Sequence, residues 1–276
     1  FVVTSVPTPP PTGYPVRITV APDGSPPNGP SVNGGMDWDG NHVVFASKAS
    51  NLVAGDSNDA YDLFIRDTCN YLAGTAPCTP TTRRIVMAVD GSQPNGDSGS
   101  TATSPTNSLA VSFFGRHVAF VSSASNLVAG DTNGVDDVYF KTCLVQVGQS
   151  ACTPALVWAS IRADGSQSSF PASYPAVAED GRYVLFVSAD PNMVAGDANG
   201  TADVFLRDTC VGAGAGCTQS TTRVSASAGG DANGASGEPV FTGRYVAFTS
   251  TASNLVASDS NGVSDVFLHD TCIGAT

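Results

Sequence analysis

Four loops of this chain combine acidic and amide side chains at a fixed spacing that suits a divalent cation. Each copy reads Asp-x-Asn-x-x-x-Asp, and in three of them Gly follows the Asn. The candidate ligands are Asp56, Asn58, Asp62, Asp131, Asn133, Asp137, Asp197, Asn199, Asp203, Asp259, Asn261 and Asp265. Side-chain oxygens at positions 1, 3 and 7 of a tight loop, with a backbone carbonyl at position 5, are the hard donors that calcium prefers. The pattern therefore predicts calcium as the bound ion.

The alternative is a plain hairpin turn, in which Asn-Gly bends the chain and the aspartates face water. A turn needs no Asp at both ends, yet both ends are acidic in all four copies. The loops resemble shortened versions of the calcium loops of integrin-type propellers and EF-hands. They lack the acidic residue at position 5 and the distant Glu of those loops, which lowers the affinity that we expect for calcium.

The internal copies also test for catalytic residues, because a catalytic side chain should stand out from a repeat. His42, His117 and His269 all fall at repeat positions, which indicates structural or surface roles. Asp37 and Asp39 are a pair of carboxylates of the kind used in glycoside hydrolysis, but Asp39 belongs to a turn that recurs. The sequence has neither a GxSxG nor an HExxH motif. We therefore expect no enzyme, with a hydrolase of unrecognised site as the remaining alternative.

The acidic loops are one part of a longer repeat of predicted strands. A Gly turn and an apolar run precede each loop, as in GNHVVFAS, and a second apolar run such as DLFI follows it. A further strand that ends in a Gly turn recurs at 16–24, 83–91, 156–165 and 222–230. Four strands recurring about every 62–75 residues, without an amphipathic helical stretch, indicate an all-β protein built of β-propeller blades.

The run GRYVLFVS followed by DVFLRD resembles the TolB-like β-propeller repeat over roughly residues 16–272. The resemblance implies the blade and no particular function. We expect a Pro-rich N-terminal arm at 1–15 and, at 16–276, a propeller of four blades with four antiparallel strands each. The strand Arg17–Val20 is expected to close the ring by completing the blade formed by 238–241, 244–250 and 265–269. An open fragment of a larger ring is the alternative.

Composition and cysteine spacing limit the partners and the compartment. Lys and Arg number 12 against 24 acids, so the net charge of −12 argues against a nucleic-acid partner. No apolar run reaches the roughly 18 residues of a membrane span. Close cysteine pairs predict the disulfides Cys69–Cys78, Cys143–Cys152 and Cys210–Cys217, and leave Cys272 over. Disulfides indicate an extracellular or cell-surface location.

These features together predict a secreted, calcium-stabilised structural or adhesive protein. The arm begins with the strand-like segment FVVTSV, which has no place in the repeat. Such a strand can add to the sheet edge of a neighbour, and with the odd Cys272 it suggests head-to-tail association of the protein with itself into filaments. The alternative is a monomeric propeller that binds a protein or glycan, for which Trp38 and Trp158 are candidate markers of the binding face.

Overall fold

Four antiparallel sheets follow one another along the chain in the computed structural model, which describes residues 15–69, 79–144 and 154–273. Most of the predicted N-terminal arm (1–15) lies outside these residues. The first sheet is β1 (Ser31–Met36), β2 (His42–Ser47), β3 (Asp62–Asp67) and β4 (Thr81–Arg84). The second is β5 (Leu109–Val111), β6 (Val118–Ser122), β7 (Asp137–Lys141) and β8 (Leu156–Trp158). The third is β9 (Ala172–Val177), β10 (Tyr183–Ser188), β11 (Asp203–Asp208) and β12 (Ser220–Arg223). The fourth is β13 (Ser236–Thr242), β14 (Tyr245–Ser250) and β15 (Asp265–Asp270).

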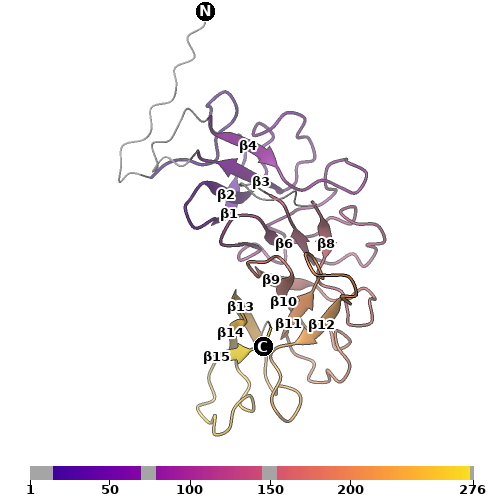
Figure 1. Ribbon diagram of the computed structural model, residues 1–276. Helices are drawn as coiled ribbons and strands as arrows, with labels where there is room; N and C mark the ends of the chain where they lie inside the picture. The colour runs from indigo at the N-terminus through magenta and orange to yellow at the C-terminus, as the bar shows by residue number, and fades with distance from the viewer. Residues whose placement is uncertain (1–14, 70–78, 145–153, 274–276) are drawn as a thin grey trace, which may run out of the picture.

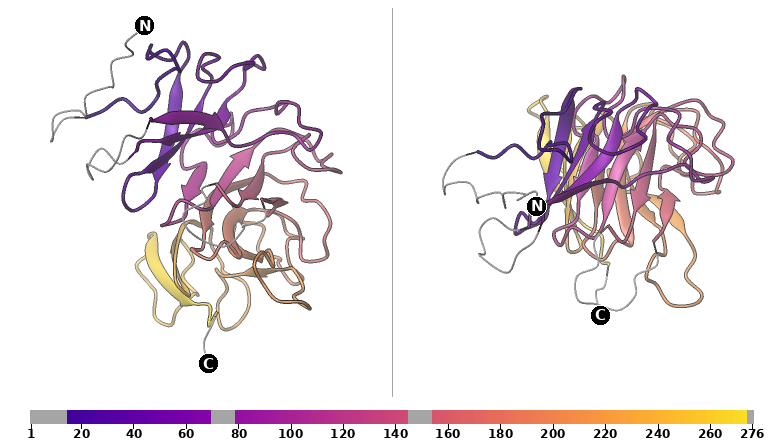
Figure 2. Two further views of the ribbon diagram at one scale, coloured as in Figure 1. Left: turned by 45° about the horizontal axis from the view of Figure 1, so that its top comes forward. Right: turned by 90° about the horizontal axis from the view of Figure 1, so that it is seen from above.

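Each sheet is one blade of a β-propeller, with its strands paired in sequence order. The first strands of successive blades contact one another: β1 contacts β5, β5 contacts β9, and β9 contacts β13. They are the inner strands of the propeller. Figures 1 and 2 show the blades arranged along an arc, with the first blade at one end and the fourth at the other. The structure therefore confirms the all-β blade architecture that the repeat predicts. Within the described ranges, no helix is long and apolar enough to cross a membrane.

The recurring Ala-Ser-Asn sequence of a blade forms hydrogen bonds with the segment that leads into that blade. In the second blade, the side-chain oxygen of Asn126 accepts a hydrogen bond from the Asn95 backbone N–H (3.0 Å), and the Asn95 amide donates to the Ser125 hydroxyl (2.9 Å). The first and fourth blades repeat these contacts at Asn28 and Asn233. These words recur because they fix the turn before each first strand, which is a structural role.

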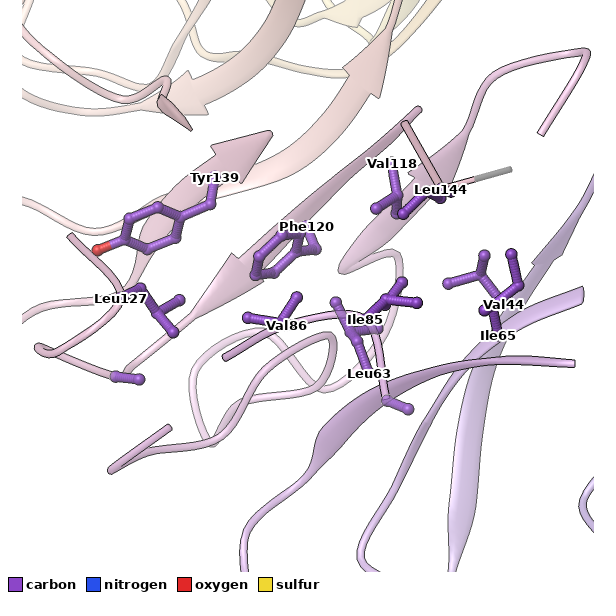
Figure 3. Packing of buried hydrophobic residues seen from close by; sticks show 12 residues of the cluster. Val44, Leu63, Ile65, Ile85, Val86, Val118, Phe120, Leu127, Tyr139 and Leu144 are labelled. Carbon is purple, nitrogen blue, oxygen red and sulfur yellow. The ribbon is translucent and has the colours of Figure 1, made fainter. Parts of the chain in front are cut away.

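Apolar side chains from both faces of the middle strands form the core between neighbouring blades. The cluster between the first and second blades includes Val44, Leu63, Ile65, Ile85, Val86, Phe120 and Tyr139 (Figure 3). Similar clusters lie between the second and third blades and between the third and fourth. The second and third blades thus bury both faces against neighbours, and the first and fourth blades each bury one face against a neighbour, which stabilises the repeat.

Closure of the fourth blade by the N-terminal strand, which the repeat predicts, is not seen among the described residues. Its sheet has three strands among the described residues, and residues 15–20 form no strand. Ile18 instead packs against Phe45 and Phe64 of the first blade. The repeat places Arg17–Val20 at the position of an outer strand, but repeat equivalence does not determine which blade receives that strand.

The cysteines agree with the predicted hairpin pairing where the structure describes them. Cys210 and Cys217 form a disulfide with a Cα–Cα distance of 5.8 Å. Cys69 and Cys143 are also disulfide-bonded, and the partners predicted for them, Cys78 and Cys152, lie outside the described residues. Cys272 is a free, exposed thiol.

Candidate functional site

Every acidic loop joins the second and third strands of its blade, and its last Asp is the first residue of the third strand. In all four loops the Asn amide donates to that Asp: Asn58 to Asp62 (3.3 Å), Asn133 to Asp137 (2.8 Å), Asn199 to Asp203 (2.8 Å) and Asn261 to Asp265 (2.7 Å). The Asn side-chain oxygen accepts from the backbone N–H two residues on, as in the 2.9 Å contact with Thr201. The turn therefore uses both ends of the amide.

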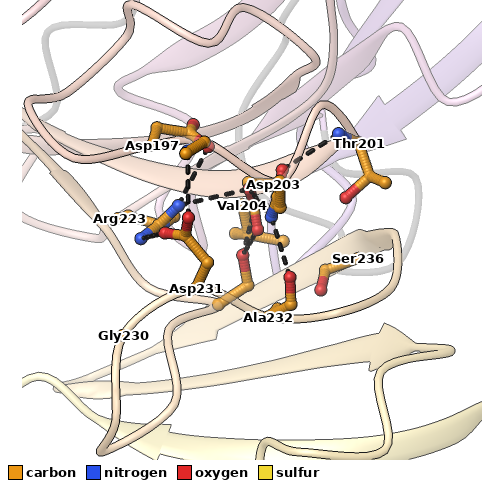
Figure 4. A network of polar contacts seen from close by, with 12 residues as sticks. Asp197, Thr201, Asp203, Val204, Arg223, Gly230, Asp231, Ala232 and Ser236 are labelled. Atoms are coloured by element: carbon orange, nitrogen blue, oxygen red, sulfur yellow. Dashed lines mark hydrogen bonds and ion pairs between the residues drawn. The ribbon is translucent and has the colours of Figure 1, made fainter.

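In the first and third loops an arginine lies between the two aspartates. The Arg84 guanidinium lies 2.8 Å from Asp56 and 3.0 Å from Asp62. Arg223, at the same register position in the third blade, lies 3.0 Å from Asp197 and 3.6 Å from Asp203. Figure 4 shows this cluster, in which Asp231 also pairs with Arg223. Each guanidinium takes the place that a bound cation would occupy.

The second loop replaces the arginine by neutral hydrogen-bond donors. Trp158 takes the register position of Arg84, because Trp158 pairs with Tyr139 as Arg84 pairs with Phe64. The Tyr139 hydroxyl donates to Asp131, and the Ser160 hydroxyl donates to Asp137 at 2.6 Å. Hydrogen bonds thus stabilise these two carboxylates without a neighbouring positive charge.

Burial raises the pKa of several of these carboxyl groups. The pKa of Asp62 is raised to about 6 by burial, against the opposing effect of Arg84. Burial also raises the pKa of Asp137 to about 6, although hydrogen bonds from Ser160 and Asn133 oppose the rise. The pKa of Asp203 is raised for the same reason. Removal from water destabilises each charged carboxylate more than its partners restore.

The fourth loop has the same turn and lacks the compensating groups. Asn261 binds Asp265, but Asp259 and Asp265 form no ion pair within the described part of the chain. The fourth sheet has, among the described residues, no counterpart of the strand that carries the arginine in the first and third blades. Two carboxylates thus lie at an open sheet edge without a neighbouring cation.

The loop geometry does not fit calcium in the first three blades. Protein groups already stabilise both carboxylates of each loop, and the Asn presents its amide N–H groups to the second Asp instead of an oxygen to an ion. In the first loop, the buried Asp62 Oδ2 has no hydrogen-bond partner and faces the Arg84 guanidinium. A calcium ion there would have to displace an arginine held at about 3 Å. Of the four predicted calcium sites, the fourth, with Asp259, Asn261 and Asp265, is the one that we still expect to bind the ion. Calcium binding remains a prediction to be tested by experiment.

The loops also connect consecutive blades. The Asn amide of each of the first three loops donates to a carbonyl of the next blade: Asn58 to Pro94 (3.1 Å), Asn133 to Ser168 (3.0 Å) and Asn199 to Ala232 (3.1 Å). The residue after the first Asp donates its backbone N–H in the same direction: Ser57 to Gln93 (3.1 Å), Thr132 to Gln167 (3.1 Å) and Ala198 to Asp231 (2.9 Å). The acidic loop is therefore a joint between blades.

Sequence reasoning missed the arginines that complete this joint. Arg84 and Arg223 recur at one repeat position, and Arg17 occupies the same position in the N-terminal segment. That recurrence was a usable signal. The recurrence is interrupted in the second copy, where Trp158 takes the position of the arginine. A motif search limited to the loop also does not reach a strand some 20 residues away.

The other candidate residues have structural contacts. His42 Nδ1 lies 2.7 Å from the Asp37 carboxylate, and Asp39 accepts from the Asn41 backbone N–H within its turn. The His117 ring packs against Phe140, and burial lowers the pKa of His117 to about 4. These contacts agree with the structural roles that the repeat positions predict.

Trp38 belongs to an exposed aromatic group at the inner end of the blades. Its ring is 62% exposed and stacks on Phe113 at a centroid distance of 5.9 Å. Phe114 packs edge-on against Phe113. A cavity of about 460 Å³ lies beside this group and is also lined by Glu179 and Phe241.

No protein-family model matches the sequence, and no curated protein matches it. Among solved structures, a prolyl endopeptidase matches with a TM-score of 0.41 and 10% identity over 88% of this chain and 27% of its own. A protein assigned as TolB from Agrobacterium tumefaciens matches with 0.32 and 14% over 87% and 81%. The β-propeller domain of the Trilobed protease from Pyrococcus furiosus matches with 0.33 and 11% over 87% and 68%. The chain thus spans about a quarter of the endopeptidase, and these likenesses assign it no activity, substrate or partner.

Proposed function

We propose that this chain is a structural or adhesive protein of the cell exterior whose subunits associate head-to-tail. The observation that carries the proposal is the open edge of the fourth blade. Val266 and Leu268 of β15 are 75% and 72% exposed, whereas their counterparts in the third blade, Val204 and Leu206, are 0% and 8% exposed. An exposed, apolar edge strand is a template for pairing with another chain.

The first blade offers a complementary face. Phe45 and Phe64 lie on its outward side, at the repeat positions of Phe120 and Tyr139, but they are 4% and 0% exposed, and Ile18 and Val53 pack against them. The exposed part of this side is therefore the N-terminal segment at 15–17. A contact between the outward faces of the fourth and first blades of two copies joins unlike surfaces. Such a heterologous contact propagates as a filament unless the rotation closes it into a ring. The disulfides support an extracellular location for this assembly.

Sedimentation velocity across a range of protein concentrations tests the proposal. We expect the full-length protein to form a concentration-dependent series of oligomers, and negative-stain images to show filaments or closed rings. Deletion of residues 1–13 tests the part of the arm that precedes the described residues. A full-length protein that stays monomeric at every concentration would contradict the proposed function.

A second candidate function is binding of a protein or glycan by the monomer. The exposed stack of Trp38 on Phe113 favours it, because aromatic side chains that are exposed and rigid are common in binding sites. Saturable binding to a glycan array by monomeric protein, lost in Trp38→Ala, is the result that would support this function. Retention of binding in that variant would exclude the aromatic group as the site.

A further inference from the structure

We propose that residues 15–18 of one copy form the missing outer strand of the fourth blade of a second copy, with Arg17 between Asp259 and Asp265. This inference rests on the proposed head-to-tail association and names its contact. It predicts a specific strand, a register and an ion pair. Four observations on the described residues support it.

The N-terminal segment leads into the same turn that follows an outer strand. The Ala21 N–H donates to the Ser25 carbonyl (3.0 Å) and the Gly24 N–H to the Ala21 carbonyl (2.9 Å). The same two hydrogen bonds form at Ala88 after the outer strand β4, both at 2.9 Å. The residues that precede this turn therefore occupy the repeat position of an outer strand.

The packing of Ile18 repeats that of Ile85. Ile85 follows β4 and lies in the core with Phe120, Leu127 and Tyr139 of the next blade. Ile18 lies against the corresponding residues of the first blade, Phe45, Leu52 and Phe64. Residues 15–18 therefore contact the first blade through Ile18 in the same way as the end of β4 contacts the second blade through Ile85.

The charges at the two ends are complementary. Arg84 and Arg223 pair with the loop aspartates of their own blades. Arg17 occupies the same repeat position, is exposed, and forms no ion pair among the residues that the structure describes. Among the described residues, Asp259 and Asp265 have neither the arginine of the first and third loops nor the hydroxyl donors of the second. One copy therefore presents the cation that the fourth blade of another copy lacks.

The register that follows from the repeat accommodates a proline. In the first blade, Ile85 donates to the Leu63 carbonyl at 2.9 Å, so the pair Ile65–Arg83 is hydrogen-bonded and the pair Arg66–Thr82 is not. Pro15 takes the position of Thr82 and would lie opposite His269. A residue at this position directs its N–H away from the partner strand, which is the side of an edge strand where proline is tolerated.

The joint of the fourth loop completes the contact. Asn58 donates to the Pro94 carbonyl, and Pro27 takes the position of Pro94 in the N-terminal segment. By the same register, Asn261 of the second copy would donate to the Pro27 carbonyl of the copy that supplies the strand, and the Ile18 N–H of that copy would donate to the Val266 carbonyl of the second. Figures 1 and 2 show the first and fourth blades at opposite ends of the arc, which favours a contact between two copies.

Charge variants of the full chain test the ion pair. We expect Arg17→Glu and Asp259→Lys each to weaken association about tenfold or more, because each leaves like charges facing at the interface. The double variant should associate more tightly than either single variant. Arg17→Lys, which keeps the charge, and Asp164→Lys, in an exposed turn of the third blade, serve as controls and should associate nearly as the wild type does.

Cross-linking tests the register. Val16 and Leu268 are 40% and 72% exposed and correspond to the paired residues Arg83 and Ile65. Two tagged forms with Cys272→Ser, one with Val16→Cys and one with Leu268→Cys, should form a mixed disulfide dimer on oxidation. Met87→Cys in place of Val16→Cys is the control, and should give none.

The outcomes separate this inference from the proposed function. If the wild type is monomeric at all concentrations, both fail. If the wild type associates while the charge variants associate equally well and no mixed disulfide forms, this inference fails and the proposed function stands. If Val16→Cys and Leu268→Cys in one chain react within a monomer, the strand closes its own ring, and the contact with a second copy is wrong.

Discussion

At the scale of single residues, the aspartates of the loops are organised by the side chains that face them. The same turn is completed by an arginine in two blades and by Tyr139 and Ser160 in another. The pattern in the sequence identified the carboxylates correctly as a cluster. It did not identify their partners, which lie outside the loop and differ in type between copies: Arg84 and Arg223 lie in the following strand, and Tyr139 lies in β7.

The buried arginine of the third blade should be important for stability. Arg223 is about 9% exposed and faces Asp197, Asp203 and Asp231. Replacement by Met leaves three carboxylates without their cation, and we expect the free energy of unfolding to fall by about 3–5 kcal/mol. Urea denaturation of Arg223→Met measures the loss. Arg244→Met removes an exposed, solvent-screened pair with Asp270 and should cost far less. Similar losses in both variants would contradict the prediction.

The raised pKa of Asp137 predicts how stability depends on pH. An unfolded Asp titrates near 3.9, whereas burial raises the pKa of Asp137 in the folded chain to about 6. The folded state therefore binds more protons between about pH 4 and 6, and the free energy of unfolding from this group falls as pH rises through that range. Asp137→Asn, which mimics the neutral acid, should remove about 2–3 kcal/mol of this decrease.

Urea denaturation of wild type and Asp137→Asn at intervals from pH 4 to 7 provides the comparison. Asp164→Asn is the control, because hydrogen bonds from Ser166 lower the pKa of Asp164 and place its titration below this range. If the difference in unfolding free energy between wild type and Asp137→Asn is the same at pH 4 and pH 7, the assigned cause is wrong.

At the scale of elements, the sequence predicts the blades well because each strand has its own recurring words. Runs such as GRYVLFVS form the second strand of each sheet, and the acidic loop leads into the third. The closure of the ring was not predictable in this way. Repeat equivalence shows that residues 16–20 complete an outer strand, but the blade they join depends on the curvature of the whole arc, which the sequence words do not encode.

The Asn-Gly turn before the first strand explains one glycine of the repeat. A Cβ on Gly96 would lie 2.8 Å from the Ser123 backbone, and Gly29 and Gly234 are equally close to backbone atoms. We expect Gly96→Ala to reduce the free energy of unfolding by about 1–3 kcal/mol, because the backbone must move apart. Thermal or urea denaturation measures the change.

Gly237→Ala is the matched control for this substitution. Gly237 lies in β13, and a Cβ there would meet no atom within 4 Å. Since alanine also reduces the freedom of the unfolded chain, we expect this variant to be unchanged or slightly more stable. Equal destabilisation by both substitutions would show that the close approach at Gly96 is not the cause.

At the scale of the whole molecule, the arc has two unlike ends that suit each other. The fourth blade has an exposed apolar edge and two aspartates that form no ion pair with the described residues. The first blade is preceded by an exposed arginine at the repeat position of an outer strand. The three joints within the chain show what such a contact looks like when it is complete. The fourth loop, with Asp259 and Asp265, is the site of both the calcium prediction and the assembly prediction.

Calcium and Arg17 should compete for the same two carboxylates. A guanidinium occupies the place of a cation in the first and third loops, and Tyr139 and Ser160 bind the carboxylates of the second. We therefore expect calcium at the fourth loop, with Asp259 and Asp265. We expect calcium to stabilise a monomeric variant that lacks residues 1–17 by about 2.7 kcal/mol when its free concentration is 100 times its Kd, which corresponds to one site instead of four.

Calorimetry of that truncated variant in calcium and in EDTA measures this effect. Asp259→Asn in the same background should abolish the stabilisation by calcium, whereas Asp164→Asn should not.

In the full-length protein calcium should weaken association, because the ion must leave before Arg17 of another copy can bind. Sedimentation velocity in calcium and in EDTA measures that change. Equal melting temperatures of the truncated variant in both conditions would mean that all four loops are turns and joints without a metal. Stronger association in calcium would mean that the ion bridges the subunits together with Arg17, and the competition would be wrong.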